Sequence, residues 1–300
     1  MPYDNEELEK FRLSGKILRE TREEMRSQVK ENMQIIEVCE KAENLIRTKG
    51  GKPAFPCNVS INEVAAHYTA TPGDKSTIPA GSTVKVDIGV QIDGYVTDTA
   101  FTIAFNAEGR SMTTTAEHAL KAAIDSIHGD MTTGRIGGII ETAIRNRGFK
   151  PISNLTGHSV GRFIVHAGTS IPNVAQLSVT KVKTGEVFAI EPFVTQPDAI
   201  ARVDDSPQTT IYRLIRPRST KNAFAKQLLK HIETNYRTLP FAERWLIGVV
   251  PKEQHKEAFK ELLSSKAVSG YPVFVEASKR PVAQAEHTVL IKEDGCEVLT

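Results

Sequence analysis

The sequence predicts a mixed α+β fold that carries a helical insertion in its last third. Three observations predict it. Segments rich in β-branched and aromatic residues lie in both halves of the chain, and amphipathic helices separate them. Between two of the later strand candidates, residues 200–268 turn to helical spacing. These features favour one α+β domain that is interrupted by a helical subdomain.

The first expected element is helical and covers residues from about 5 to 49. Apolar residues recur there at helical spacing until Gly50-Gly51 ends the run. The charged stretch at 19–32 alternates in sign, which is typical of a solvated helix face.

A β-hairpin is expected next, over residues 84–104. The stretch VKVDIGVQIDGYVTDTAFTIA is rich in strand-forming residues and is interrupted by Asp93-Gly94, a frequent turn pair. Two amphipathic helices should follow. The first is predicted behind a capping box formed by Thr114 and Glu117, and the second should end at Gly148.

Further strands are expected at 186–190 and 271–276, and strand-like alternation returns in the last 30 residues. The pattern between them is helical from about 200 to 268. We therefore expect a domain made of residues 1–199 and 269–300, with residues 200–268 as a helical insertion subdomain.

The composition is that of an ordinary globular protein, with 40% hydrophobic and 25% charged residues among 300. The formal charge of +2 gives no electrostatic support for binding nucleic acid or anionic lipid. Three widely spaced cysteines, Cys39, Cys57 and Cys296, are expected to be reduced thiols. An acidic start without a signal-peptide pattern, and the lack of a long apolar run, predict a cytoplasmic protein without a membrane anchor.

Asp87 and Asp98 form the most informative local feature. Across a hairpin with an even-numbered turn, two residues of opposite parity lie on the same face, either opposite each other or one diagonal step apart. Two carboxylates at such a short distance repel each other unless a cation neutralises them, so the pair indicates a metal site. An odd turn or a bulge would spoil this geometry, and one aspartate could then simply face solvent.

Three more candidates, His158, Glu191 and Glu286, lie at the edges of apolar strand-like runs. Each alone is compatible with a structural role. Together with the aspartates they supply four carboxylates and one imidazole, a ligand set suited to Mn, Fe, Co or Zn.

Five segments carry a family resemblance. They are FPCNVSINEVAAHYTA (55–70), VDIGVQIDGYVTDTAFT (86–102), GHSVGRFIVHAG (157–168), AIEPF (189–193) and AEHTVL (285–290). In this order they resemble the type II methionine aminopeptidases, especially the short archaeal form. The resemblance implies the pita-bread fold and a dinuclear centre in which Asp98 and Glu286 bridge two divalent ions. Asp87 would bind one ion, and His158 and Glu191 would complete the other.

The resemblance also implies roles outside the metal ligands. Glu191 would take and return a proton, while His67 and His166 would contact the scissile group. Phe55, Val165 and Phe193, with the His67 ring, would surround the methionine side chain, although core packing explains Val165 equally well. The implied protein is a monomer that removes the N-terminal methionine of nascent polypeptides, close to the ribosome.

Two other readings stay open at this stage. The same fold occurs in proteins that bind peptides, RNA or histones without cutting them, although such relatives usually lose some of the five ligands. Proline-directed relatives, aminopeptidase P and prolidase, usually carry a sizeable extra N-terminal domain, for which about 50 residues before Phe55 leave no room.

Overall fold

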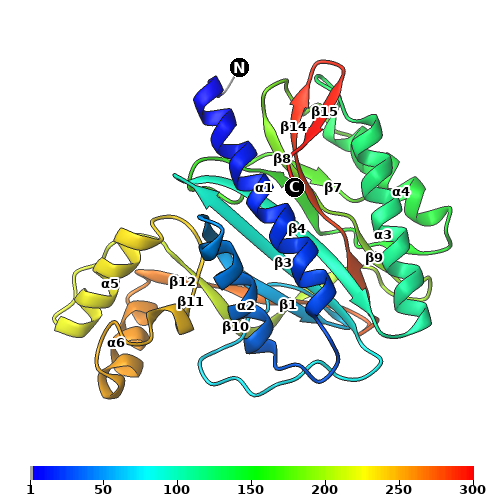
Figure 1. The fold of residues 1–300 in the computed structure, drawn as a ribbon. Coiled ribbons are helices and arrows are strands. Elements are labelled where there is room, and N and C mark those ends of the chain that lie inside the picture. Colours follow the sequence, from blue (N-terminus) through cyan, green and yellow to red (C-terminus); the bar gives the residue numbers. More distant parts are fainter. Residues whose placement is uncertain (1–2) are drawn as a thin grey trace.

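Four antiparallel sheets flanked by helices make up residues 3–300, the part of the chain that this computed structural model describes (Figure 1). Met1 and Pro2, at the acidic start of the sequence, lie outside the described residues. The helices are α1 (Asn5–Gln28), α2 (Ile35–Thr48), α3 (Ala107–Ser126), α4 (Thr133–Arg145), α5 (Ala223–Asn235), the 3-10 helix η1 (Glu243–Leu246) and α6 (Lys252–Ser264).

The strands form the sheets in the following orders. The first sheet is β1 (Lys52–Ile61), β3 (Thr83–Ile92) and β4 (Tyr95–Ala104). The second is β13 (Val282–Gln284), β9 (Phe193–Thr195) and β5 (Lys150–Pro151). The third is β15 (Gly295–Val298), β14 (His287–Lys292), β8 (Val187–Ile190), β6 (Thr156–Ser159) and β7 (Ser170–Pro172). The fourth is β11 (Phe241–Ala242), β10 (Val203–Leu214), β12 (Val268–Glu276) and β2 (Val64–Ala66).

Two helix pairs cover the sheets that hold the candidate site. Helix α1 lies across β3 and β4, and α2 packs on β1 (Figure 1). Helices α3 and α4 pack on strands of the second and third sheets. Each pair closes its own apolar cluster, one containing Leu18, Val38 and Phe101 and the other containing Ile140, Phe188 and Val289. The strands between them are therefore held rigidly from outside.

The predicted hairpin is confirmed, and its turn fixes the register. Asp93 and Gly94 have φ values of 51° and 92°, the left-handed conformation that a two-residue hairpin turn requires at both positions. Asp87 then pairs with Ala100, and Gly89 pairs with Asp98. The two aspartates are thus diagonal neighbours on one face of the hairpin, as parity predicted.

The prediction of helix from about 5 to 49 is right except for a break. Residues 29–34 connect α1 to α2, and Asn32 takes a left-handed conformation with φ of 66°. The Asn32 N–H donates to the carbonyl of Ile78, and the Ile35 N–H donates to that of Ser76. Backbone bonds to a distant loop replace the helical ones, and a local apolar pattern contains no sign of such bonds.

The capping box predicted at Thr114 is wrong. Helix α3 begins seven residues earlier, at Ala107, and its N-cap is Asn106, whose side chain accepts from the Gly109 N–H at 2.6 Å. Thr114 lies inside the helix, where its hydroxyl donates to the Arg110 carbonyl. A threonine that bonds back to the preceding turn fits a helix interior, so the box pattern alone was misleading.

Helical structure between residues 200 and 268 is confirmed for α5, η1 and α6 but is wrong for residues 203–214. Those residues form β10, which pairs with β12 along most of its length and also with β11. Register shifts between Asp205 and Ile211 interrupt the pairing. Pro207 and the preceding acidic residues hide the strand from a propensity argument.

The three cysteines are free thiols, as expected. Within residues 3–300, no helix has the length and apolar character that crossing a membrane requires.

Candidate metal centre

One cavity of about 210 Å³ lies where the first, second and fourth sheets approach the third. All ten residues singled out from the sequence line it: Phe55, His67, Asp87, Asp98, His158, Val165, His166, Glu191, Phe193 and Glu286. They come from eight separate places along the chain, so tertiary packing brings them together.

Asp87 and Asp98 enter this cavity from neighbouring strands. The backbone of Asp98 is fixed by Thr288 of β14, whose hydroxyl accepts from the Asp98 N–H at 2.7 Å and donates to its carbonyl at 2.8 Å. Asp87 receives a hydrogen bond from Asn58 Nδ2 at 3.3 Å. The hairpin is therefore anchored to β1 on one side and to β14 on the other.

Glu286 is held against the same hairpin. Its N–H donates to the Ala100 carbonyl at 3.0 Å, and its own carbonyl accepts from the Thr99 hydroxyl at 2.6 Å. These bonds leave the side chain free to point into the cavity. Glu286 is buried, as is Asp98.

His158 and Glu191 approach from the third sheet. His158 pairs with Ala189 at the end of β8, and Glu191 follows that strand directly. The His158 Nε2 atom lies 3.5 Å from Glu191 Oε1 and 3.7 Å from Asp98 Oδ2. One imidazole nitrogen thus faces two carboxylates.

Burial makes this concentration of negative charge unfavourable. It raises the pKa of Asp87 to about 7, and burial together with repulsion from Asp87 and Glu191 raises the pKa of Asp98 well above its ordinary value. Burial and neighbouring carboxylates also raise the pKa values of Glu191 and Glu286. Within residues 3–300, no lysine or arginine forms an ion pair with any of the four.

The donor atoms fit divalent cations. Asp87 Oδ1, Asp98 Oδ1 and Glu286 Oε1 are buried and have no hydrogen-bond partner in the described chain. Ligand atoms of Asp98, His158 and Glu286 lie within 4.8 Å of one another. His158 Nδ1 lies 3.4 Å from the Ser159 carbonyl, so the proton belongs on Nδ1 and the Nε2 lone pair is available to a metal.

His67 has an unusual backbone beside this cluster. Its φ of 66° is left-handed, a conformation that costs free energy for most side chains other than Gly and Asn. Its ring packs on Phe274 and Tyr271, and burial lowers its pKa to about 4. Nδ1 lies 3.3 Å from the Pro272 carbonyl, which can only accept, so the neutral ring carries its proton there. Its Nε2 atom is then an acceptor.

The remaining predicted residues form the rest of the wall. His166 is exposed, and its ring centroid lies 4.3 Å from that of His158. Phe55 and Val165 belong to one buried apolar cluster with Leu239, whereas Phe193 belongs to another. The Phe55 ring occupies the space above Gly89, where a Cβ atom would lie 2.3 Å from it. The cavity thus combines a polar end with apolar sides.

Sequence reasoning missed several lining or supporting residues. Asn58 donates to Asp87, and Gln284 Nε2 lies 3.3 Å from Glu191 Oε2 and 3.4 Å from Glu286 Oε2. Both lie within or beside segments that carry the resemblance, and Gln284 precedes Glu286 by two positions, the period of an extended strand. Tyr271 and Pro240 also line the cavity, and no local signal marks them.

Comparisons with known proteins identify the family of this chain. The model of metallopeptidase family M24 matches residues 9–293. The methionine aminopeptidase of Methanothermobacter thermautotrophicus is 42% identical over 98% of this chain and 98% of its own. That of Pyrococcus horikoshii is also 42% identical, over 98% of this chain and 99% of its own.

A solved structure shows the same fold at lower identity. The crystal structure of a methionine aminopeptidase from Thermotoga maritima superposes with a TM-score of 0.71 at 22% identity, and covers 99% of this chain and 98% of that one. The fold is therefore the pita-bread fold of these structures, as the resemblance implied. Because the family model and the relatives cover nearly the whole chain, the protein belongs to metallopeptidase family M24.

Proposed function

We propose that this protein is a metal-dependent aminopeptidase that removes the N-terminal methionine from nascent polypeptides. One observation carries the proposal. Four carboxylates and one imidazole converge at the polar end of a cavity with apolar sides, and three of the carboxylate oxygens lack any partner within residues 3–300. The 42% identity to archaeal methionine aminopeptidases supports the choice of substrate.

Two divalent ions, Co, Mn, Fe or Zn, would be held by the five side chains. Asp98 and Glu286, which with His158 place ligand atoms within 4.8 Å of one another, would contribute to holding both ions. Asp87 would complete the ligand set of one ion, and His158 and Glu191 would complete that of the other. When bound, such a pair supplies a Lewis acid and lowers the pKa of water, which permits hydrolysis at neutral pH.

The protein's own groups would then handle protons and orient the substrate. Glu191, steadied by Gln284, is placed to accept a proton and return it to the leaving amine. The neutral His67 ring, protonated on Nδ1, presents Nε2 as an acceptor for the scissile amide N–H. The exposed His166 would donate to the substrate carbonyl oxygen.

Phe55, Val165, Phe193 and the His67 ring would surround the methionine side chain. An unbranched thioether fits a narrow apolar slot that lacks polar groups along its sides. The slot ends at the five side chains that would hold the metal ions, so a free α-amino group would lie beside the bound ions. Cleavage would then be limited to the first residue of a chain.

The proposal extends to organisation and place of action. Residues 200–268 would form an insertion subdomain on a catalytic domain of residues 1–199 and 269–300. The separate apolar cluster of α5 and α6 supports this division, whereas β10 extends a sheet that contains β2 and β12. Because its substrates are newly made polypeptides, we expect a cytoplasmic monomer that acts close to the ribosome; light scattering at 33.0 kDa tests the oligomeric state.

Metal content and peptide hydrolysis test the activity. The protein should turn over Met-Gly-Met with at least one of Mn, Co, Fe and Zn, and should cleave Met-Ala-Ser in preference to Xaa-Pro peptides. Metal analysis should find two ions per chain. No turnover with any of the four metals would favour a binding protein, and a preference for Xaa-Pro would favour a prolidase-type activity.

A further inference from the structure

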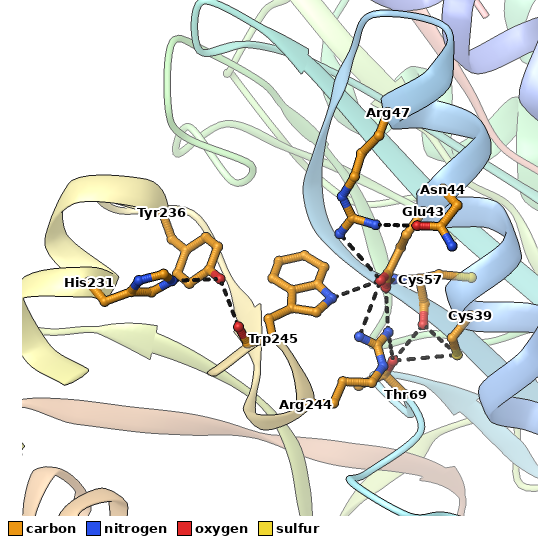
Figure 2. Close-up of polar contacts among 10 residues, drawn as sticks. All are labelled: Cys39, Glu43, Asn44, Arg47, Cys57, Thr69, His231, Tyr236, Arg244 and Trp245. Carbon is orange, nitrogen blue, oxygen red and sulfur yellow. Dashed lines mark hydrogen bonds and ion pairs between the residues drawn. The ribbon is translucent and has the colours of Figure 1, made fainter. Parts of the chain in front are cut away.

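Outside the candidate metal centre, the buried carboxylate of Glu43 on α2 contacts several charged and polar partners behind the cavity wall. Arg244 of η1 forms an ion pair with it, and the Trp245 indole donates to Glu43 Oε2 at 2.7 Å. Arg47 lies 3.8 Å away. Figure 2 shows Arg47, Arg244 and the Trp245 ring pointing toward the Glu43 carboxylate from different sides. Neither Glu43 nor Arg244 lines the cavity.

The same carboxylate holds an irregular part of β1. Glu43 Oε1 accepts from the Cys57 N–H at 3.1 Å. Cys57 lies within the register shift between Phe55 and Asn58, where pairing with β3 is interrupted. A strand N–H that has lost its ladder partner thus finds one in Glu43. The paired residues that bound this shift, Phe55 and Asn58, both line the cavity.

Arg244 connects Cys57 of β1 to His67, which forms a second wall of the cavity. Its guanidinium donates to Thr69 Oγ1 at 3.1 Å, and Thr69 in turn donates to the Cys57 carbonyl at 2.7 Å. The Thr69 N–H donates to Thr210 Oγ1 at 3.1 Å, and that hydroxyl donates to the His67 carbonyl at 3.2 Å. The strained residue His67 is therefore two side chains away from the ion pair.

The third wall comes from the segment that leads into η1. Within residues 236–242, Leu239 is buried with Phe55 and Val165, and Pro240 lines the cavity. Arg244 and Trp245 follow this segment at once. Their bonds to Glu43 fix the C-terminal end of this segment, whose other contacts include the Thr238 hydroxyl donating to the Phe163 carbonyl and the pairing of β11 with β10.

We propose that Glu43 and Arg244 are positioning residues that set the shape of the methionine side-chain pocket by fixing β1, His67 and residues 236–242 together. This inference rests on the proposed function. A buried ion pair contributes little stability beyond an apolar replacement, but it demands a defined geometry of both partners. Strand β1, His67 and residues 236–242 are all connected to the two-bond contact between Glu43 and Arg244. This contact can therefore keep the pocket between them at a constant width.

The test uses three variants of the full chain and one matched control. Arg244→Met breaks the pair, Arg244→Lys keeps the charge, and the double variant Glu43→Gln with Arg244→Met leaves no buried ion unpaired if the single variant folds poorly. Arg12→Met removes another arginine that contacts a glutamate through two nitrogens, Glu297 of β15, and neither residue lines the cavity.

Breaking the pair should raise the KM for Met-Ala-Ser about tenfold, the effect of an imperfectly filled apolar pocket, while kcat stays within about twofold. The preference for Met-Ala-Ser over Leu-Ala-Ser, measured as the ratio of kcat/KM values, should fall as well. Arg244→Lys should restore part of the KM and part of this preference. Metal content and the Arg12→Met control should match the parent. Trp245 is the only tryptophan of the sequence and its indole donates to Glu43, so a red shift of its emission indicates that this indole has become more exposed to water.

A red shift with unchanged KM and unchanged preference would overturn the inference, and so would a fall in kcat accompanied by loss of metal. If the parent protein turns over no peptide, the proposed function fails, and calorimetric binding of L-methionine decides the inference separately. Binding about tenfold weaker in the broken-pair variants supports it. Equal binding, or none by the parent, refutes it.

Discussion

Glu43 and the carboxylates of the candidate metal centre are buried on opposite sides of the cavity wall, and their hydrogen-bonding and charge requirements are met in opposite ways. Glu43 meets two arginines, an indole N–H and a backbone N–H, so the protein supplies all its partners. Asp87, Asp98 and Glu286 each keep a buried oxygen without a partner in the described chain, and no lysine or arginine there pairs with them. A carboxylate whose partners are all supplied by the protein stabilises the structure, whereas a buried cluster without such partners favours the binding of cations from solution.

The largest expected effect is on activity and comes from replacing one of the carboxylates that lack a partner. Asp98→Asn should lower kcat/KM for Met-Ala-Ser by about 10³-fold or more, because loss of the proposed metal pair would remove several kcal/mol of charge stabilisation. Mass spectrometry of the metal content should show fewer than two ions per chain. Full metal content with normal activity would remove Asp98 from the ligand set.

The free energy of unfolding should respond in the opposite way, with a large loss at Glu43 and none at Asp98. Glu43→Ala leaves Arg244 buried without its partner and should reduce the free energy of unfolding by about 3–5 kcal/mol. In the presence of a chelator, Asp98→Asn should instead leave stability unchanged or raise it, because it removes repulsion among buried carboxylates. Urea denaturation of both variants makes the comparison, and equal losses would contradict it.

His67 adds a residue that is next to the metal centre but is not assigned to it. His67→Ala and His67→Asn should both lower kcat about 10²-fold, because each removes the imidazole that is proposed to contact the reacting amide. Both should retain two ions. Only the alanine variant should also lose about 1 kcal/mol of stability, since asparagine tolerates a φ of 66° and alanine does not. Loss of metal in either variant would make His67 a ligand.

The smallest effect concerns an ion pair at the surface. Arg12, with Lys292, holds the pKa of Glu297 at about 2, below its ordinary value near 4.5. A depressed pKa contributes stability above pH 4.5, and that contribution is lost as the pH falls toward 2. Arg12→Met should therefore cost less than about 1 kcal/mol at pH 7, because the pair is one-third exposed, and clearly less at pH 2, where the Glu297 carboxylate is partly protonated. Unfolding curves at both values test this, and a constant difference would contradict it.

The part of the centre that local reasoning could predict is the pair on the hairpin. A two-residue turn and the parity of positions 87 and 98 are sufficient, because they belong to neighbouring strands. The positions of His158, Glu191 and Glu286 depend on pairing between β6, β8 and β14, whose strands are separated by many residues. Their place in the set came from the family resemblance.

Other failures have local causes. Strand β10 contains a proline and adjacent acidic residues, and its pairing with β12 overrides their low propensity for strand. The cap of α3 is a single asparagine, which competed with a complete but unused box further along the helix. The Glu43 cluster was not found at all. A glutamate at a helical position in a charged sequence gives no sign that it is buried.

The turn at Asp93-Gly94 limits how this chain can change in length. Exposed hairpin turns commonly tolerate an added or deleted residue. Here a shift of one position in register would rotate Asp98 to the face that now carries Thr97, and the two aspartates would then lie on opposite sides of the sheet. Two-residue changes would preserve the face, whereas one-residue changes would not. A turn that contacts no ligand is thus as restricted in length as the candidate metal centre is in composition.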